Sequence, residues 1–291
     1  MNVVGSPAEL ESRRRAVAIG SFDGVHRGHR SVLGAVRGTG LEPTVITFDP
    51  HPRVALGNKV ELLTTLERRL ELLGDAGIET VLVAPFDAEL QELRPEAFAE
   101  RFLHKIGVEC VVAGDNFRFG VRRSGDLDTL RALGFEVIVP PEIEGVSSTA
   151  IRTALAQGDV VSAAAMLGRP FELDGIVVAG DQRGGTLGYP TANLRLKPDL
   201  ACPHFGIYAG SALDHRAAIS IGTNPHYGGI ERRIEPYLLD YEGDLYGQRL
   251  VVELWERLRD EAVFESEEAL VAQIARDVEA TRAARRPQSN P

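Results

Sequence analysis

The stretch AVAIGSFDGVHRGHRSVL, residues 16–33, begins as an apolar run and changes character at a glycine. Residues 16–21 are apolar without alternation, as expected of a strand that is buried on both faces of a parallel sheet. Two histidines, His26 and His29, follow, and residues 28–37 are compatible with a helix. The stretch therefore predicts a strand, a turn and a helix. Ligands of α/β proteins bind at such turns, beyond the carboxyl ends of parallel strands.

The first half of the chain repeats this alternation of short β-branched runs and helix-compatible segments. Alternating strands and helices predict an α/β fold with a Rossmann-like parallel sheet, covered by helices on both faces. The further expected strands are 44–48, 80–85, 110–113 and 136–139, and the further expected helices are 66–75, 95–105, 126–133 and 149–156.

After Gly168 the pattern changes to short strand candidates separated by turns, with no helices between them. This pattern is typical of a small antiparallel β-barrel. A single helix closes the chain, with Ser266 as its N-cap and an apolar stripe of Leu270, Ile274 and Val278. The sequence therefore predicts two domains, residues 1–168 and residues 169–291.

The overall charge of the 291-residue chain is −10, from 42 acidic and 32 basic residues. Proteins that bind a nucleic-acid backbone are generally basic or carry a basic stripe, so no nucleic-acid partner is expected. The two cysteines lie in no metal-binding spacing and suggest no disulfide framework. Without an 18-residue apolar run or the apolar core of a signal peptide, we expect a cytoplasmic protein with no membrane partner. The oligomeric state cannot be predicted from the sequence.

The histidine pair has a chemical interpretation and two simpler ones. A helix N-terminus has unpaired N–H groups that favour phosphate, and Gly24 and Gly28 let the backbone approach a ligand closely. His26 and His29, three residues apart, point to one side and can stabilise charge that develops on phosphorus. Alternatively, the two imidazoles are polar surface residues or an adventitious metal pair.

A second candidate segment is VSSTAIR, residues 146–152, where Ser147, Ser148 and Thr149 precede Arg152. Helix capping alone explains the hydroxyl groups. Together with Arg152, however, the segment is also suited to bind phosphate.

A third candidate, GDQRGGTLGYPTANL, residues 180–194, is glycine-rich but does not match the Walker A pattern. Thr191 and Asn193 supply neutral oxygens suited to Mg²⁺ that carries ATP phosphates. Glu235, on a strand further along, is either a rim residue or an inward-facing general base for an alcohol. Read as structure alone, the glycine-rich segment is a hairpin.

The HxGH pattern at residues 26–29 is similar to that of the nucleotidyltransferase superfamily. The ordered set of motifs across nearly the whole chain resembles the bacterial bifunctional riboflavin kinase/FAD synthetase family. The resemblance implies that ATP phosphorylates riboflavin to FMN, and that a second ATP adenylylates FMN to FAD with release of pyrophosphate. The motifs are GSFDGVHRGH, TFDPHP, GDNFRFG, RRSGDL, VSSTAIR, GDQRGGTLGYPTAN, IGTNP and DYEGDLYG.

For the adenylyltransferase domain, the resemblance implies contacts to ATP phosphates, nucleotide and flavin. Ser21 keeps a hydrogen-bonding group in this site, and His51 either lines the flavin pocket or is a structural turn residue. The residues implied to bind ATP or flavin here, beside Ser21 and His51, are His26, Gly28, His29, Asn116, Ser148, Thr149 and Arg152. Among these, His26, His29 and Arg152 are expected to act in catalysis.

For the kinase domain, the resemblance implies that Gly184, Thr191 and Asn193 bind ATP, with Mg²⁺ on Thr191 and Asn193. Glu235 would accept the proton of the ribityl hydroxyl. Riboflavin, FMN and ATP are the implied small-molecule partners, and FAD is the final product.

The sequence alone is also compatible with two further hypotheses. One is a chain that retains only the adenylyltransferase activity, and the other is a flavin-binding storage or regulatory protein. Other activities of the superfamily, on pantetheine phosphate or nicotinamide mononucleotide, leave the motifs of the second domain unexplained. Four positions depart from the family's usual residues: Ser21, Gly185, His226 and Pro236, the last of which removes an N–H from its strand.

Overall fold

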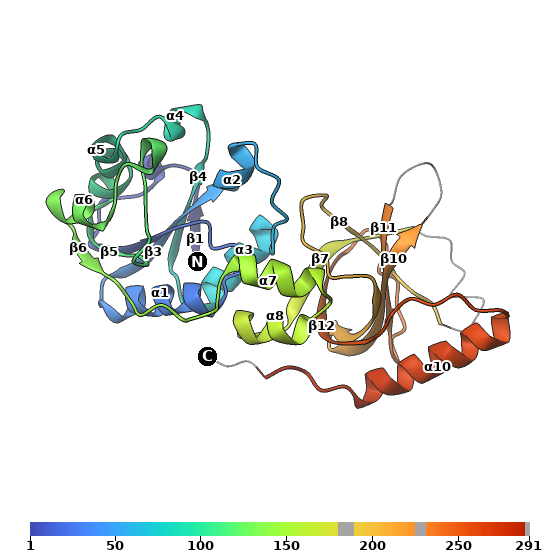
Figure 1. Cartoon of the computed structure of the whole chain (residues 1–291). Helices are drawn as coiled ribbons and strands as arrows, with labels where there is room; N and C mark the ends of the chain where they lie inside the picture. The colour runs from blue at the N-terminus through green and yellow to red at the C-terminus, as the bar shows by residue number, and fades with distance from the viewer. Residues whose placement is uncertain (180–188, 225–230, 289–291) are drawn as a thin grey trace. The chain divides into compact units, whose positions relative to one another are not determined.

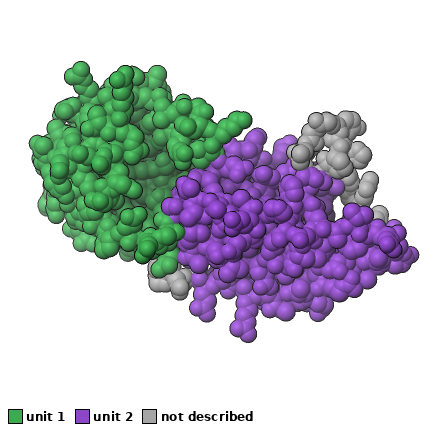
Figure 2. Space-filling view, viewed as in Figure 1, with its two compact units in different colours: residues 1–60, 66–146 green, residues 61–65, 147–291 purple. Residues whose placement is uncertain are grey.

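A computed structural model describes residues 1–179, 189–224 and 231–288 (Figure 1). The chain divides into two compact units, coloured separately in Figure 2. Unit 1 comprises residues 1–60 and 66–146, and unit 2 comprises residues 61–65 and 147–291.

Unit 1 contains a six-stranded sheet in the order β1-β4-β3-β2-β5-β6, and every neighbouring pair is parallel. This confirms the predicted α/β fold. From β2 the chain adds β3 and β4 on one side, then returns to add β5 and β6 on the other, so the topological switch point lies beside β2. The strands are β1 (Asn2–Val4), β2 (Arg15–Ile19), β3 (Glu42–Asp49), β4 (Thr80–Pro85), β5 (Val108–Val112) and β6 (Glu136–Ile138).

Strand β2 shows why the apolar run does not alternate. Ala16 and Ala18 lie in one hydrophobic core, whereas Val17 and Ile19 lie in the core on the opposite face of the sheet. Because successive side chains of a strand point to opposite faces, a strand buried on both sides needs apolar residues at every position.

Helices cover both faces of this sheet. Helices α1 and α3 contribute to the core that contains Ala16, and α5 and α6 contribute to the core that contains Val17. The segment predicted as one helix over 95–105 is instead α5, a π-helical turn (Ala99–Leu103) and a 3-10 turn (His104–Ile106). Strand β1 was not predicted. The helices of unit 1 are α1 (Arg27–Gly38), α2 (Pro52–Ala55), α3 (Leu66–Asp75), α4 (Ala88–Gln91), α5 (Pro95–Phe98) and α6 (Leu127–Ala132).

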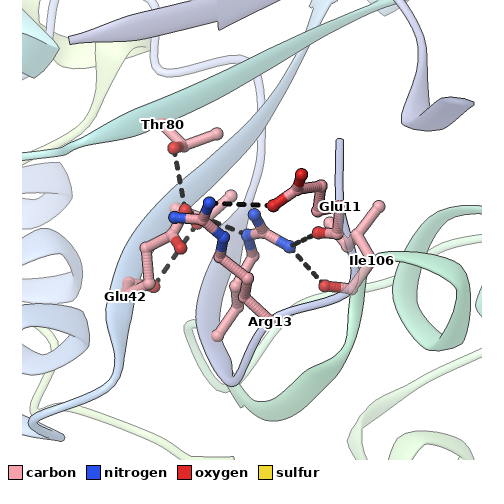
Figure 3. Close-up of polar contacts among 7 residues, drawn as sticks. Glu11, Arg13, Glu42, Thr80 and Ile106 are labelled. Atoms are coloured by element: carbon pink, nitrogen blue, oxygen red, sulfur yellow. Dashed lines mark hydrogen bonds and ion pairs between the residues drawn. The ribbon is translucent and has the colours of Figure 1, made fainter. Parts of the chain in front are cut away.

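At the amino ends of the strands, the buried guanidinium of Arg15 joins three segments. Its Nε donates to Glu42 Oε1 at 3.1 Å, and its Nη1 donates to the carbonyls of Glu11 and Ile106. Thr80 donates its hydroxyl to the same Glu42 oxygen at 2.9 Å (Figure 3). The network links the starts of β2, β3 and β4 at the edge of the sheet opposite the HxGH turn.

We expect Arg15→Met to destabilise unit 1 by about 3 kcal/mol, because removal of one partner leaves the other groups of a buried ion pair unsatisfied. Hydrogen–deuterium exchange of the β2 amides measures this, as it reports the opening of unit 1 in the full chain. Arg14→Met is the matched control, since Arg14 pairs with Glu109 on the surface and its loss should leave the exchange unchanged. Equal exchange rates of the β2 amides in both variants would contradict a stabilising role for Arg15.

Unit 2 contains a six-stranded antiparallel sheet in the order β11-β10-β9-β12-β7-β8. The Ala192 N–H donates to the Pro236 carbonyl at 2.9 Å, so the segment that leads into β8 reaches β11 and nearly closes a barrel. This confirms the predicted barrel and C-terminal helix, which begins after Ser266 as expected. The elements are β7 (Phe171–Val178), β8 (Asn193–Leu196), β9 (Gly206–Ala212), β10 (His215–Asn224), β11 (Glu231–Leu238), β12 (Arg249–Arg259) and α10 (Glu267–Ala283).

Two segments outside the barrel belong to unit 2. Helices α7 (Ser148–Ala156) and α8 (Val160–Leu167) contribute to the barrel core. Residues 61–65 are also held there, because Leu62 exchanges backbone hydrogen bonds with Asp199 and Ala201 at 2.6 and 2.7 Å. The compact units thus divide at 146/147, and the predicted division of the activities at 168/169 stays a prediction. Across the described ranges, no helix is long and apolar enough to cross a membrane.

Candidate active sites

The first site is built on the turn between β2 and α1, beside the switch point of the sheet. Phe22 and Val25 have φ values of 49° and 41°, and Gly24 has φ 84°. A left-handed backbone is unfavourable for aromatic and β-branched residues. The turn therefore holds a strained conformation immediately before the histidine pair.

His26 and His29 lie together, as the sequence predicts. His26 is buried and caps α1, which begins at Arg27 rather than near Gly28, and its Nδ1 accepts the His29 N–H at 3.2 Å. The two rings stack with centroids 3.6 Å apart. A Cβ at position 28 would lie 3.2 Å from the His26 ring, which explains the glycine.

The two imidazoles have distinct hydrogen-bonding states. Because His26 Nδ1 accepts a backbone N–H, the proton of the neutral ring is on Nε2. Burial, and secondly the adjacent His26, lower the pKa of His29 well below its usual value of 6.5. His29 is therefore neutral at pH 7. Its Nδ1 is a buried atom without a hydrogen-bond partner in the described part of the chain.

The first turn of α1 has the charge that attracts an anion. It contains no acidic residue, although acidic side chains are favourable at a helix N-terminus, and it carries Arg27 and Arg30 instead. The Nε atoms of both arginines are buried and lack hydrogen-bond partners among the described residues. A bound phosphate would offset the positive potential of the helix end and of these guanidinium groups.

The sequence did not predict a role for Arg69, which binds the backbone of the β2–α1 turn. Arg69 is 5% exposed, and its guanidinium donates to the Ser21 carbonyl at 2.7 Å and to the Phe48 carbonyl at 3.3 Å. The Ser21 carbonyl also accepts the Thr47 hydroxyl at 3.3 Å. The available signal was the helical period of α3, which puts Arg69 on the same buried face as Leu72.

His51 and Asn116 follow β3 and β5, the two neighbours of β2. Since the carboxyl ends of parallel strands share one edge of a sheet, both residues lie on the edge that carries the histidine pair. His51 is buried and caps α2, where its Nδ1 accepts the Arg53 N–H at 3.1 Å. It is thus a structural turn residue, and its contact with flavin stays a prediction. Asn116 is exposed.

Ser148, Thr149 and Arg152 begin α7, for which Ser147 is the cap. They lie in unit 2, whereas the histidine pair lies in unit 1. The Arg152 Nε donates to the carbonyl of Glu61, within the short segment of unit 2 that precedes α3. The predicted common triphosphate site therefore stays a prediction.

The second site is a cavity of about 320 Å³ in unit 2. It brings together Thr191, Asn193 and Glu235, which come from two segments of the barrel. The Glu235 carboxylate forms an ion pair with Arg233 Nε at 2.9 Å, and the Tyr189 and Tyr237 rings meet edge to face.

The cavity is also lined by residues for which the sequence predicts only a structural role. Phe264, Leu270 and Ile274 line it, so the expected apolar stripe of α10 is partly a cavity wall. Arg259 is held by a bidentate ion pair with Asp277, with its Nε at 3.0 Å from Oδ1 and its Nη2 at 2.7 Å from Oδ2. The lining of the cavity thus combines polar and charged side chains with apolar ones.

A larger cavity, of about 540 Å³, shares Asn193 and Arg233 with the first. It is strongly cationic, since Arg195, Lys197 and Arg232 also line it, and the carboxylate of Glu61 is their acidic neighbour. Such a lining suits a polyphosphate.

Among the positions that depart from the family's pattern, Pro236 is accommodated by the fold. The Pro236 carbonyl accepts the Ala192 N–H, on the side of β11 that faces away from β10. In a strand, the N atom and the carbonyl of one residue point to the same side. The missing N–H therefore lies on the side of β11 that faces Ala192, and the pairing of β10 with β11 stays intact. Gly184, Gly185 and His226 lie outside the described residues.

Comparison with protein-family models matches residues 8–153 to FAD synthetase and residues 167–285 to riboflavin kinase. Relatives described as bifunctional riboflavin kinase/FMN adenylyltransferase occur in Listeria monocytogenes, at 35% identity over 92% of each chain, and in Escherichia coli K12, at 38% over 90% of each. The chain belongs to this family. The FAD synthetase match contains the histidine pair, and the riboflavin kinase match contains Thr191, Asn193 and Glu235.

A solved structure from Streptococcus pneumoniae, named a macrolide-efflux protein, has the same fold. Its TM-score is 0.85 at 30% identity, and the match covers 96% of this chain and 98% of that one. An experimental structure thus shows the fold of this bifunctional riboflavin kinase/FMN adenylyltransferase family member over nearly the full length of the chain.

Proposed function

We propose that the two activities of the family are carried by the two separate sites described above. The chain is a bifunctional enzyme with riboflavin kinase and FMN adenylyltransferase activities. The observation that supports the division is that each family match contains one of the two sites. The histidine pair would adenylylate FMN, and the cavity beside Glu235 would phosphorylate riboflavin.

In the kinase site, riboflavin would place its flat, largely apolar ring against Phe264, Leu270 and Ile274. Its terminal ribityl hydroxyl would face Glu235, which lines the same cavity. Glu235 accepts the hydroxyl proton as the oxygen bonds to the γ-phosphorus of ATP, and the bond from that phosphorus to ADP breaks. Arg233, 2.9 Å from Glu235, would hold this carboxylate in its orientation.

ATP would enter the kinase site through the cationic cavity, with its γ-phosphate at Asn193, where the two cavities meet. The donors near this point suit Mg²⁺, because Thr191 and Asn193 offer hard neutral oxygens and no cluster of three or more metal-ligating side chains exists among the described residues. Mg²⁺ bound mainly through phosphates needs only one or two protein ligands. When bound, it neutralises phosphate charge.

In the adenylyltransferase site, a phosphate oxygen of FMN attacks the α-phosphorus of ATP, and pyrophosphate leaves. The attacking phosphate is already ionised at pH 7, so no general base is needed. His26 and His29 would donate ring N–H bonds to the oxygens that gain charge, together with the N-terminus of α1.

The remaining predicted residues would complete this site. Asn116 would contact nucleotide or flavin, and Ser148, Thr149 and Arg152 would bind the triphosphate. Ser21 would contribute a hydroxyl to this site. We also propose that the protein acts in the cytoplasm, which agrees with its two unpaired cysteines, Cys110 and Cys202.

The purified chain, given riboflavin, ATP and Mg²⁺, is expected to produce FMN and then FAD, and given FMN it is expected to produce FAD and pyrophosphate. Chromatography of the flavins with their intrinsic fluorescence measures both steps. Chelation of Mg²⁺ by EDTA should stop both reactions, and an excess of added Mg²⁺ should restore them.

The alternative readings predict other outcomes of the same assay. Conversion of FMN without conversion of riboflavin would show that only the adenylyltransferase is active. Flavin binding without consumption of ATP would indicate a storage or regulatory protein.

A further inference from the structure

The turn that presents His26 needs an external restraint. Phe22 and Val25 adopt a left-handed backbone, which residues of their type rarely do unless the surroundings hold them. The strained conformation has a visible effect, because it places the Phe22 ring against His29 with centroids 5.2 Å apart. The geometry of the histidine pair is thus tied to the geometry of this turn.

Arg69 supplies that restraint from a helix distant in sequence. Its Nη1 donates to the carbonyl of Ser21, directly before the strained Phe22, and its Nη2 donates to the carbonyl of Phe48 at the end of β3. One planar group therefore fixes the turn to the neighbouring strand. The two donors come from separate nitrogens of one rigid, planar guanidinium, which suits this group to bridge two carbonyls.

Burial of the Arg69 guanidinium is unfavourable, and hydrophobic packing does not require a cation at this position. Arg69 is 5% exposed, and its Nε is a buried donor with no hydrogen-bond partner among the described residues. Burial lowers the pKa of Arg69, while the carboxylates of Asp23 and Asp49 oppose that effect. An apolar side chain would fill the same space without an unsatisfied donor, but it would remove the donors to the two carbonyls and the cation beside Asp23 and Asp49.

We propose that Arg69 is a positioning residue for FMN adenylylation, which holds the β2–α1 turn so that His26 and His29 face the reacting phosphate. It acts through the turn and touches neither substrate. The inference rests on the proposed role of the histidine pair. It goes beyond that role because it assigns the geometry of the pair to a residue outside every motif of the sequence.

The test compares Arg69→Met, Arg69→Lys and Arg68→Met in the full chain. We expect Arg69→Met to lower kcat of FMN adenylylation about 10- to 100-fold, because small displacements of catalytic groups cost that much. The KM values for FMN and ATP should change less than kcat, and the riboflavin kinase rate of the same protein should not change. Arg69→Lys should retain part of kcat, since an ammonium keeps the charge and its donors but lacks the rigid, planar fork that reaches the two carbonyls from separate nitrogens.

Arg68→Met is the matched control, because Arg68 lies in the same helix and pairs with Glu71 at 2.7 Å. It should keep both activities. A wild-type protein that makes no FAD from FMN would refute the proposed function itself, before any variant is compared.

Two outcomes would overturn the role of Arg69. One is an Arg69→Met protein, with a wild-type melting temperature, that adenylylates FMN at the wild-type kcat. If Arg69→Met does not fold, Arg69→Lys decides: a folded lysine variant with wild-type kcat would show that no guanidinium bridge is needed.

Discussion

Glu235→Gln is expected to lower kcat of riboflavin phosphorylation by about 10²- to 10⁴-fold, the range associated with loss of a general base. Glutamine keeps the shape of the side chain in the cavity but cannot accept the proton of the ribityl hydroxyl. The variant should still convert FMN to FAD at the wild-type rate, because that reaction is assigned to the histidine-pair site and not to the cavity beside Glu235. Separate assays with riboflavin and with FMN measure the two rates.

Asp240→Asn is the control for Glu235→Gln. Asp240 also forms a carboxylate–arginine pair in unit 2, with Arg282 at 2.8 and 2.9 Å, but it is exposed and does not line the cavity. Its loss should leave both rates unchanged. A Glu235→Gln protein that phosphorylates riboflavin normally would exclude Glu235 as the base.

His29→Ala is expected to reduce FAD formation from FMN by about 10²- to 10³-fold, the loss typical of one donor that stabilises transition-state charge. The ring of His29 stacks on His26 and has a buried nitrogen without a hydrogen-bond partner among the described residues, and alanine replaces neither feature. Riboflavin phosphorylation should continue at the wild-type rate, so the product should stop at FMN.

His104→Ala controls for the removal of an imidazole from unit 1. The ring of His104 stacks on Phe135 at 4.6 Å, next to the start of β5 and therefore at the opposite edge of the sheet. This variant should make FAD normally. If His29→Ala removed both activities from a folded protein, the assignment of independent sites would be wrong.

The two sites could be predicted from the sequence to different degrees. His26, Gly28 and His29 lie within four residues, so their contacts follow from a strand, a turn and a helix that the local pattern already predicts. Thr191 precedes β8 and Glu235 lies in β11, and the motifs alone predict their roles but not the cavity that they share. Phe264 and Ile274 complete that cavity from the loop after β12 and from α10.

Several structural features had no clear local signal. Strand β1 has three residues, which is too short to show a period, and the segment 95–105 has a helical pattern that continues through a π turn and a 3-10 turn. The attachment of residues 61–65 to the barrel depends on pairing with residues 199–201, far along the chain. None of these follows from the order of residues within a short window.

By itself, the sequence determined the two fold classes, most of the strands and helices in their order and the motifs for which phosphate chemistry is proposed, because hydrophobic periodicity and helix capping act between residues close together in the chain. Only the tertiary structure decided the order of strands in each sheet, the cavity that Thr191 and Glu235 share with Phe264 and Ile274, and the bridge made by Arg69. These depend on distances between residues that lie tens of positions apart, and such distances exist only once the chain has packed around its cores.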